Sequence, residues 1–319
     1  MTAPSSTSRP GDSPHWVDSE LGAASQRSFG ALLVVLLVLL VLATACGSPH
    51  GEAFPRSAIL LAAPTTLVDS GLLDTLLPVF EERAGYTVKT LAVGTGEAVA
   101  MARRGDADVL LGHAPTLEKE ALAEGFVRNR RVVMTNDFLL VGPEADPAAV
   151  AGEADVAVAA LKIADTRSTF VSRGDDSGTH RFERSLWRRL DQTPAGAWYV
   201  ETGQGMGASL QVANQLDAYT LVDRATYLAF HDRISLRPLV TGDPRQLNVY
   251  SVMEVDPERF PRINQNGARA FADFLVEPAT QKLIADFGRD RHGEALYRPV
   301  AGEAETALTN PQPLSTAPP

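Results

Sequence analysis

The segment from Ser172 to His180, SRGDDSGTH, combines an arginine, two aspartates, two glycines, three hydroxyl side chains and a histidine. Residues of these types can form a solvated turn, a catalytic loop or a site that binds an anion. In an anion site, Arg173 supplies a positive charge whose planar donors match an oxyanion. Ser177, Gly178 and Thr179 would add hydroxyl and backbone donors where a helix begins.

Three further loops carry donors at predicted strand-to-helix junctions: residues 63–71 (APTTLVDSG), 93–98 (VGTGEA) and 201–209 (ETGQGMGAS). Free N–H groups and the positive end of a helix favour an anion there. Taken singly, each of these three loops fits the commoner role of capping a helix. Together with the arginine loop they predict one shared site. The candidate ligand-binding residues are Thr65, Thr66, Gly94, Thr95, Arg173, Ser177, Gly178, Thr179, Met206 and Gly207.

The elements that must position these loops alternate between short apolar runs and amphipathic stretches. We predict strands at 57–63, 86–93, 107–112, 136–142, 169–173, 198–201, 218–223, 236–240 and 247–255. We predict helices at 70–85, 96–105, 116–125, 157–167, 178–190, 207–217, 266–276 and 278–288. The βαβα order indicates an α/β fold with mostly parallel sheets and helices on both faces.

Two lobes fit this order better than one. We expect a first lobe at about 57–144 and 229–300, with a second lobe at about 145–228 inserted into it. In open α/β sheets, ligands bind beyond the carboxyl ends of the strands, which is where the four loops fall. The stretch 301–319, which ends in LTNPQPLSTAPP, is expected to be a disordered tail.

The apolar run 31–45, ALLVVLLVLLVLATA, is short for a spanning helix and is typical of a signal peptide. Cys46 follows small residues directly, and LATAC-GS resembles a bacterial lipobox. We therefore predict a lipoprotein signal peptide at 1–45, lipid attachment at Cys46 and a tether at 46–56. An uncleaved anchor is the alternative. The body of the protein is then extracytoplasmic, held at the outer face of the membrane.

Composition excludes some classes of function. The 319 residues carry a formal net charge of -10, which argues against a general nucleic-acid binder. Hydrophobic residues make up 45% of the chain, as in a globular protein. The chain has one cysteine, so no internal disulfide can form. Walker, zinc-ligand and HExxH motifs are absent from the sequence, and we expect no cofactor or metal.

Several ordered motifs resemble the tungstate-binding proteins of bacterial ABC importers: DSGLLDTLLPVFEERAGYTVKTLAVGTGEA, GDADVLLGHAP, NDFLLVGP, FVSRGDDSGTH, WYVETGQGMGASL and AYTLVDRATYLA. The resemblance implies the type II periplasmic-binding-protein fold, two lobes joined by a hinge, with tungstate or molybdate in the cleft. It also implies a monomer that is not an enzyme and that delivers its anion to membrane permease subunits. One departure is at Ala63 and Pro64, where the family has hydroxyl residues.

Other functions remain open at this stage. A phosphate or sulfate binder is one alternative, although His113 stands where phosphate-binding relatives place an acid. His113 is either near the anion or a hinge-packing residue. Asp175 and Asp176 either orient their loop or pair with Arg173. A serine hydrolase using Ser177 and a purely structural lipoprotein are further alternatives, and no partner histidine stands in the context that a hydrolase requires.

Overall fold

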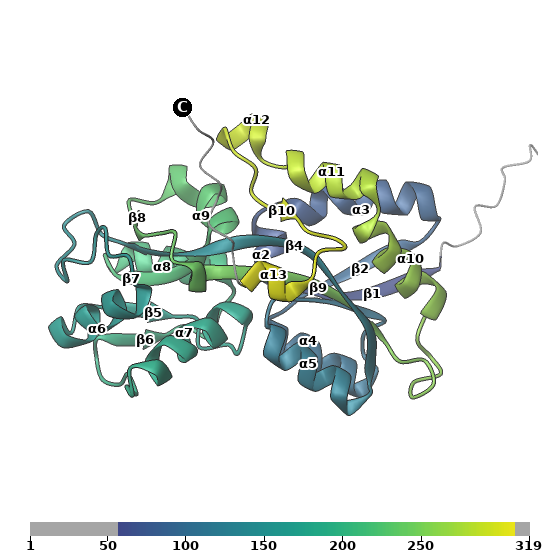
Figure 1. The fold of residues 1–319 in the computed structure, drawn as a ribbon, viewed down its shortest axis with the longest axis horizontal. Helices are drawn as coiled ribbons and strands as arrows, with labels where there is room; N and C mark the ends of the chain where they lie inside the picture. The colour runs from purple at the N-terminus through teal and green to yellow at the C-terminus, as the bar shows by residue number, and fades with distance from the viewer. Residues whose placement is uncertain (1–56, 310–319) are drawn as a thin grey trace, which may run out of the picture. The chain divides into compact units, whose positions relative to one another are not determined.

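The structure, a computed structural model, describes residues 57–309, which form two α/β lobes (Figure 1). In the first lobe, the central strand pairs in parallel with a strand on each side. Two antiparallel strands complete this sheet. Its strands are β1 (Ala58–Ala63), β2 (Thr87–Ala92), β3 (Val109–Gly112), β9 (Leu247–Val255) and the first part of β4 (Val127–Gly142). The short β10 (Arg298–Pro299) pairs with β4.

The second lobe repeats this plan with a central strand that pairs in parallel with its two neighbours. The last part of β4 joins it, antiparallel to β7 and β8. The remaining strands are β5 (Phe170–Ser172), β6 (Tyr199–Glu201), β7 (Tyr219–Asp223) and β8 (Arg237–Val240). The sheets are therefore mixed, whereas we expected mostly parallel ones, because the strands that link the lobes run against their neighbours.

Helices flank both sheets. The longer ones are α3 (Leu72–Ala84), α4 (Thr95–Arg104), α5 (Pro115–Glu124), α6 (Val156–Thr166), α7 (Gly178–Arg189), α8 (Met206–Gln215), α10 (Gln265–Val276) and α11 (Pro278–Asp286). The shorter ones are α2 (Thr65–Asp69), α9 (Arg224–Phe230), α12 (Arg289–His292) and α13 (Glu305–Thr309). Two 3-10 turns, η1 (His231–Arg233) and η2 (Pro244–Gln246), precede β8 and β9. None of these helices is long and apolar enough to cross a membrane.

Each lobe has two main apolar cores, and each core lies between the sheet and the helices that pack on it. In the first lobe, Leu76, Phe80 and Phe271 belong to one core, while α4 and α5 contribute Val99 and Leu117 to another. The second lobe has the same arrangement, with one core at α6 and α7 and another at α8. Each lobe thus buries most of its own core, although Ala225 and Leu228 of α9, which follows β7, also pack into the first-lobe core.

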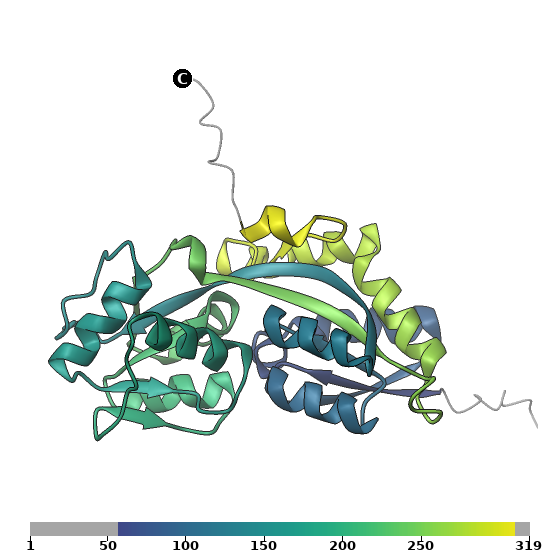
Figure 2. The same ribbon diagram turned by 60° about the horizontal axis from the view of Figure 1, so that its bottom comes forward.

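The lobes are joined by β4 and β9, the long strands that arch over the molecule in Figure 2. From Val127 to Asp137, β4 pairs with β9 in the first lobe. From Phe138 to Val141 it pairs with β7 in the second lobe. The chain returns to the first lobe at the start of β9. These two strands are the natural hinge.

Two predicted boundaries were wrong. We placed the return crossing at residue 228, but β8 pairs with the end of β4, so residues 229–246 stay with the second lobe. The sequence does not indicate which strand β8 will join. The expected disorder of 301–319 was wrong for residues 301–309, where α13 buries Leu308 against Val249 and Val300. The predicted signal peptide and Cys46 lie outside the described residues.

The strand predicted at 136–142 is also longer than expected, because β4 begins at Val127. Charged side chains interrupt the apolar pattern of its first part, and ion pairs satisfy them. Arg130 pairs with the buried Glu118 at 2.8 Å and with Glu305 of α13 at 2.6 Å. A pattern based on hydrophobicity cannot detect a strand whose polar residues find partners elsewhere in the chain.

Candidate functional site

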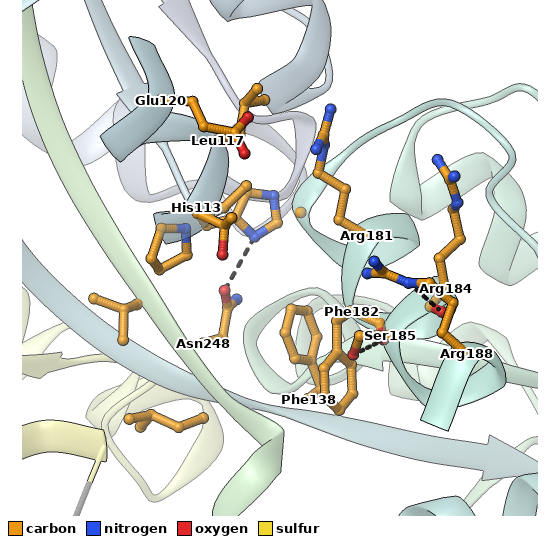
Figure 3. A pocket seen from close by; sticks show the side chains of 16 residues that line it. His113, Leu117, Glu120, Phe138, Arg181, Phe182, Arg184, Ser185, Arg188 and Asn248 are labelled. Carbon is orange, nitrogen blue, oxygen red and sulfur yellow. Dashed lines mark hydrogen bonds between the residues drawn. The ribbon is translucent and has the colours of Figure 1, made fainter. Parts of the chain in front are cut away.

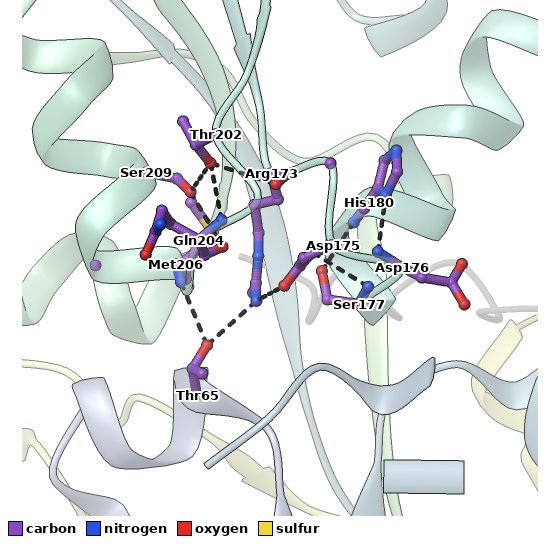
Figure 4. Close-up of polar contacts among 12 residues, drawn as sticks. Thr65, Arg173, Asp175, Asp176, Ser177, His180, Thr202, Gln204, Met206 and Ser209 are labelled. Carbon is purple, nitrogen blue, oxygen red and sulfur yellow. Dashed lines mark hydrogen bonds and ion pairs between the residues drawn. The ribbon is translucent and has the colours of Figure 1, made fainter. Parts of the chain in front are cut away.

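Arg173 lies directly after β5 and is 1% exposed. Its Nη2 donates to Thr65 Oγ1 of the first lobe over 3.3 Å and forms an ion pair with Asp175 (Figure 4). Its Nε and Nη1 are buried and have no hydrogen-bond partner among the described residues. Leaving buried charged donors unsatisfied is costly, so the guanidinium is suited to receive an acceptor from outside the chain.

The backbone on either side of Arg173 is held from several directions. Ser172 Oγ donates to Glu183 Oε2 over 2.7 Å and accepts from the Gly174 N–H over 3.2 Å. The Arg173 carbonyl accepts the Gly203 N–H over 2.8 Å. Gly174 has a φ of 62°, a conformation that favours glycine. The arginine is thus presented by a turn that hydrogen bonds hold on both sides.

Glu183 is a buried supporting residue that the sequence did not single out. Besides Ser172, it accepts from Trp187 Nε1 over 2.9 Å and from the Tyr199 hydroxyl over 2.6 Å. Burial raises the pKa of its carboxyl to about 7. Its partners come from β5, β6 and α7, so only the folded lobe brings them together.

The two aspartates of the loop have different partners. Asp175 pairs with Arg173, as one of our alternatives predicted, and its Oδ1 accepts the Ser177 N–H over 3.2 Å. Asp176 pairs instead with Arg181 of α7 at 2.6 Å. Its backbone has a φ of 56°, which places its carbonyl against the first lobe, where the Gly96 N–H donates to it over 3.2 Å.

Ser177 acts as the N-cap of α7, because its Oγ accepts the His180 N–H over 3.3 Å. The ring of His180 accepts the Asp176 N–H at Nδ1 over 3.0 Å. The structure therefore gives Ser177 the bonding of a helix cap and not that of a nucleophile activated by His180.

The loop from Arg173 to Ser177 leads into the first turn of α7 and lies beside the first turn of α4. In α7, the Thr179 hydroxyl is buried and has no partner among the described residues. In α4, Gly94 is the N-cap, and a Cβ built on it would lie 3.1 Å from the Asp175 carbonyl. Thr95 Oγ1 accepts the His113 N–H over 3.3 Å. The Gly96 and His180 N–H groups are bonded to Asp176 and Ser177, and the other leading N–H groups of these helices, which have no acceptor within the helix, favour an anion.

Of the remaining predicted residues, three join the lobes and Thr66 packs within the first lobe. Thr65 Oγ1 accepts from the Met206 N–H over 3.3 Å. The Gly207 N–H donates over 2.9 Å to Asp69, a residue that the sequence did not single out. Thr66 is buried, and its Oγ1 lies 3.3 Å from the Tyr250 hydroxyl. The four loops therefore converge as predicted, while the N–H groups of Met206 and Gly207 are already bonded to the first lobe.

His113 is held by a chain of amides on the hinge strands. Asn248 donates through Nδ2 to Asn136 over 2.8 Å, so its Oδ1 accepts His113 Nδ1 over 3.0 Å (Figure 3). The ring also stacks on Tyr250, with centroids 5.1 Å apart. Burial, together with the charge of Arg173, lowers the pKa of His113 to about 4. A neutral ring with its proton on Nδ1 keeps a lone pair on Nε2, which has no partner among the described residues.

His113 also borders a cavity of about 360 Å³ between the lobes, shown in Figure 3. Phe138 and Phe182 stack on one another within it, with ring centroids 4.8 Å apart. Glu120 of α5 and Arg188 of α7 line it from opposite lobes. In residues 57–309, no cluster of histidine, cysteine and acidic side chains is suited to hold a metal ion.

Comparison with known proteins places this arrangement in a family. Residues 48–279 match the model of the PBP superfamily domain. The chain belongs to this superfamily. The match ends within α11, so the PBP superfamily domain leaves out α12, β10 and α13. These last elements nevertheless pack on the first lobe through Leu308 and the Glu305 ion pairs.

Relatives within the PBP superfamily share most of the chain. The tungstate-binding protein TupA of Peptoclostridium acidaminophilum is 40% identical over 86% of this chain and 98% of its own. The crystal structure of the tungstate ABC transporter from Geobacter sulfurreducens is 42% identical, covers 72% of this chain and 98% of that one, and has a TM-score of 0.66. TupA from Desulfovibrio alaskensis is 42% identical over 77% and 99%, with a TM-score of 0.63. The two-lobed α/β fold is thus confirmed.

Proposed function

We propose that this protein is the extracytoplasmic solute-binding component of an ABC importer, and that it captures tungstate between its lobes. The observation that carries the proposal is the buried Arg173, whose Nε and Nη1 have no partner among the described residues. Relatives at 40% and 42% identity that are named for tungstate support the choice of anion.

The chemistry of the donors agrees with a fully deprotonated oxyanion. Tungstate and molybdate carry no proton at neutral pH, so their oxygens only accept hydrogen bonds. Among the unpartnered groups near the loops, the Arg173 nitrogens are donors and the Thr179 hydroxyl can donate, while His113 Nε2 is the one that keeps a lone pair among those described. The first turns of α4 and α7 add backbone N–H groups. Molybdate has the same charge and geometry and is the expected competitor.

The proposal includes export of the protein and its anchoring at the outer face of the membrane. We propose that residues 1–45 are removed, that Cys46 is lipidated, and that residues 46–56 tether a monomeric binding domain near the permease subunits. The order of the sequence motifs supports this, because the small residues before Cys46 and the polar residues after it fit a lipobox. The binding domain would then begin at about residue 57, just before β1.

Calorimetric titration with tungstate, molybdate, sulfate and phosphate in one buffer tests the proposal. We expect tungstate and molybdate to bind with a stoichiometry of about one and tighter than the other two anions by at least roughly tenfold, or about 1.4 kcal/mol. If phosphate or sulfate binds more tightly, the proposed ligand is that anion and not tungstate. Absence of heat with all four anions would refute an oxyanion carrier.

A further inference from the structure

The lobes touch across the cleft at two glycines that belong to opposite lobes. A Cβ built on Gly96 of α4 would lie 2.3 Å from Asp176 Oδ2 and 2.8 Å from the Asp176 carbonyl oxygen. A Cβ built on Gly178 of α7 would lie 2.4 Å from the His113 carbonyl oxygen and 2.6 Å from His113 Cγ. Real Cβ atoms essentially never approach other atoms within 3.0 Å. At each of these two contacts there is therefore room only for a residue without a side chain.

The groups that face these glycines cannot easily give way. Two of the four contacted atoms are backbone carbonyl oxygens. The His113 ring is fixed by Asn248 and by stacking on Tyr250. The Asp176 carboxylate is paired with Arg181 at 2.6 Å but is partly exposed, so the Asp176 carbonyl oxygen at 2.8 Å is the firmer obstacle at Gly96. An added methyl group at either glycine would thus meet at least one backbone atom and push the lobes apart.

Local structure does not require glycine at either position. Gly96 and Gly178 lie in the first turns of α4 and α7, and neither has a positive φ. Alanine has a higher helix propensity than glycine. Within a single lobe, alanine would therefore be accepted or favoured. The need for glycine exists only where the two lobes meet.

We propose that Gly96 and Gly178 are positioning residues that set how closely the lobes approach, and through this the affinity for the anion. The inference rests on the proposed function, in which the ligand is held between the lobes. The contact between Arg173 Nη2 and Thr65 Oγ1 is already 3.3 Å long, so a small separation of the lobes breaks it. Donors from the two lobes could then no longer surround one small anion.

The test uses Gly96→Ala in a full-length chain that also carries Cys46→Ser, Glu120→Cys and Arg188→Cys. Spin labels on the two introduced cysteines, which replace exposed residues on opposite walls of the cavity, report the separation of the lobes. Without Gly96→Ala, tungstate should shift the distance distribution to the short form. With Gly96→Ala the long form should persist. Tungstate should then bind at least roughly thirtyfold more weakly, because part of its binding free energy is used to close the lobes. Gly178→Ala should behave alike.

Glu97→Ala, at the exposed neighbour of Gly96, is the matched control and should bind like the unsubstituted protein. Asp176→Gly is the rescue. It removes the carboxylate that the introduced methyl group would meet, and the φ of 56° at this position suits glycine. The double variant Gly96→Ala/Asp176→Gly should recover several-fold of the lost affinity. The unliganded melting temperature of Gly96→Ala should be unchanged or higher, which separates a closing defect from a folding defect.

Affinity within threefold of the unsubstituted protein, or a normal short distance in Gly96→Ala, would overturn the inference. Failure of the double variant to recover affinity would show that the Asp176 carboxylate does not limit closure. If the unsubstituted protein does not bind tungstate, the proposed function fails. The unliganded distance distributions still test the glycines in that case, since Gly96→Ala must populate the short form less than the unsubstituted protein.

Discussion

The Asp175 carboxylate forms an ion pair with the Arg173 guanidinium from within the same loop. The pair uses Nη2, the nitrogen that also contacts Thr65, and leaves Nε and Nη1 without partners among the described residues. Asp175 thus lowers the net charge of the site without occupying every donor of the arginine. The proposed anion must therefore bind beside a fixed negative charge.

Replacing that charge should strengthen binding. Asp175→Asn keeps an oxygen that can accept the Ser177 N–H but removes the repulsion between the carboxylate and a dianion. A Coulomb energy of about 1 kcal/mol or more between close charges predicts at least roughly fivefold tighter tungstate binding. Calorimetry at low salt measures it. Asp176→Asn is the control, because its carboxylate pairs with Arg181, and it should change affinity less than twofold. Equal effects of both variants would contradict a special role for Asp175.

Thr65 should matter through its hydroxyl. Its Oγ1 accepts from Arg173 Nη2 and from the Met206 N–H, both at 3.3 Å and both in the second lobe. Thr65→Val keeps the shape and removes the acceptor, which should weaken tungstate binding about tenfold or more, at roughly 1–2 kcal/mol. Thr65→Ser should stay within about threefold. A Val variant that titrates like the Ser variant would show that the hydroxyl is not needed.

The sequence predicted most of the elements because their ends carry local signals. Gly85, Gly105 and Gly125 end α3, α4 and α5 with a positive φ, and the helices stop where the glycines indicated. The four donor-rich loops were found because helix caps and anion sites use the same residue types. These signals depend only on neighbouring residues.

Features that depend on distant parts of the chain were not predicted. Glu183 is an ordinary helix residue in the sequence, and its role requires Ser172 and Tyr199 from two strands. Gly96 reads as part of a common loop motif, and only the facing Asp176 shows why a side chain is excluded. The pairing of β8 and the packing of α13 likewise depend on surfaces that exist only after the lobes have formed.

Glu183 should make stability depend on pH. Its folded pKa of about 7 exceeds the ordinary value of 4.5, so between these values the native state binds more protons than the unfolded state. The free energy of unfolding should therefore fall as pH rises from 4.5 to 7 and then level off. Urea unfolding at several pH values, for the wild type and Glu183→Gln, isolates this contribution. The difference between the two proteins should change with pH in this window, and a constant difference would contradict the assignment.

Cys46 should carry the lipid anchor. Metabolic labelling with a fatty-acid analogue should mark the wild-type protein and leave Cys46→Ser unmarked. The unlabelled variant should also appear in the soluble extracytoplasmic fraction or keep its uncleaved leader. Equal labelling of both proteins would rule out lipidation at this residue.

The central claim, that Arg173 binds the anion, is tested most directly by titrating tungstate into wild type and Arg173→Ala in one buffer. Hydrogen bonds to charged groups contribute about 1.5–3 kcal/mol each, and a bidentate arginine makes two of them. The account predicts that Arg173→Ala binds tungstate roughly a hundredfold more weakly, which corresponds to a loss of about 3 kcal/mol of binding free energy. Arg173→Lys should recover only part of the affinity, because an ammonium cannot reproduce the planar pair of donors. Dissociation constants for wild type and Arg173→Ala that agree within a few-fold would contradict the account.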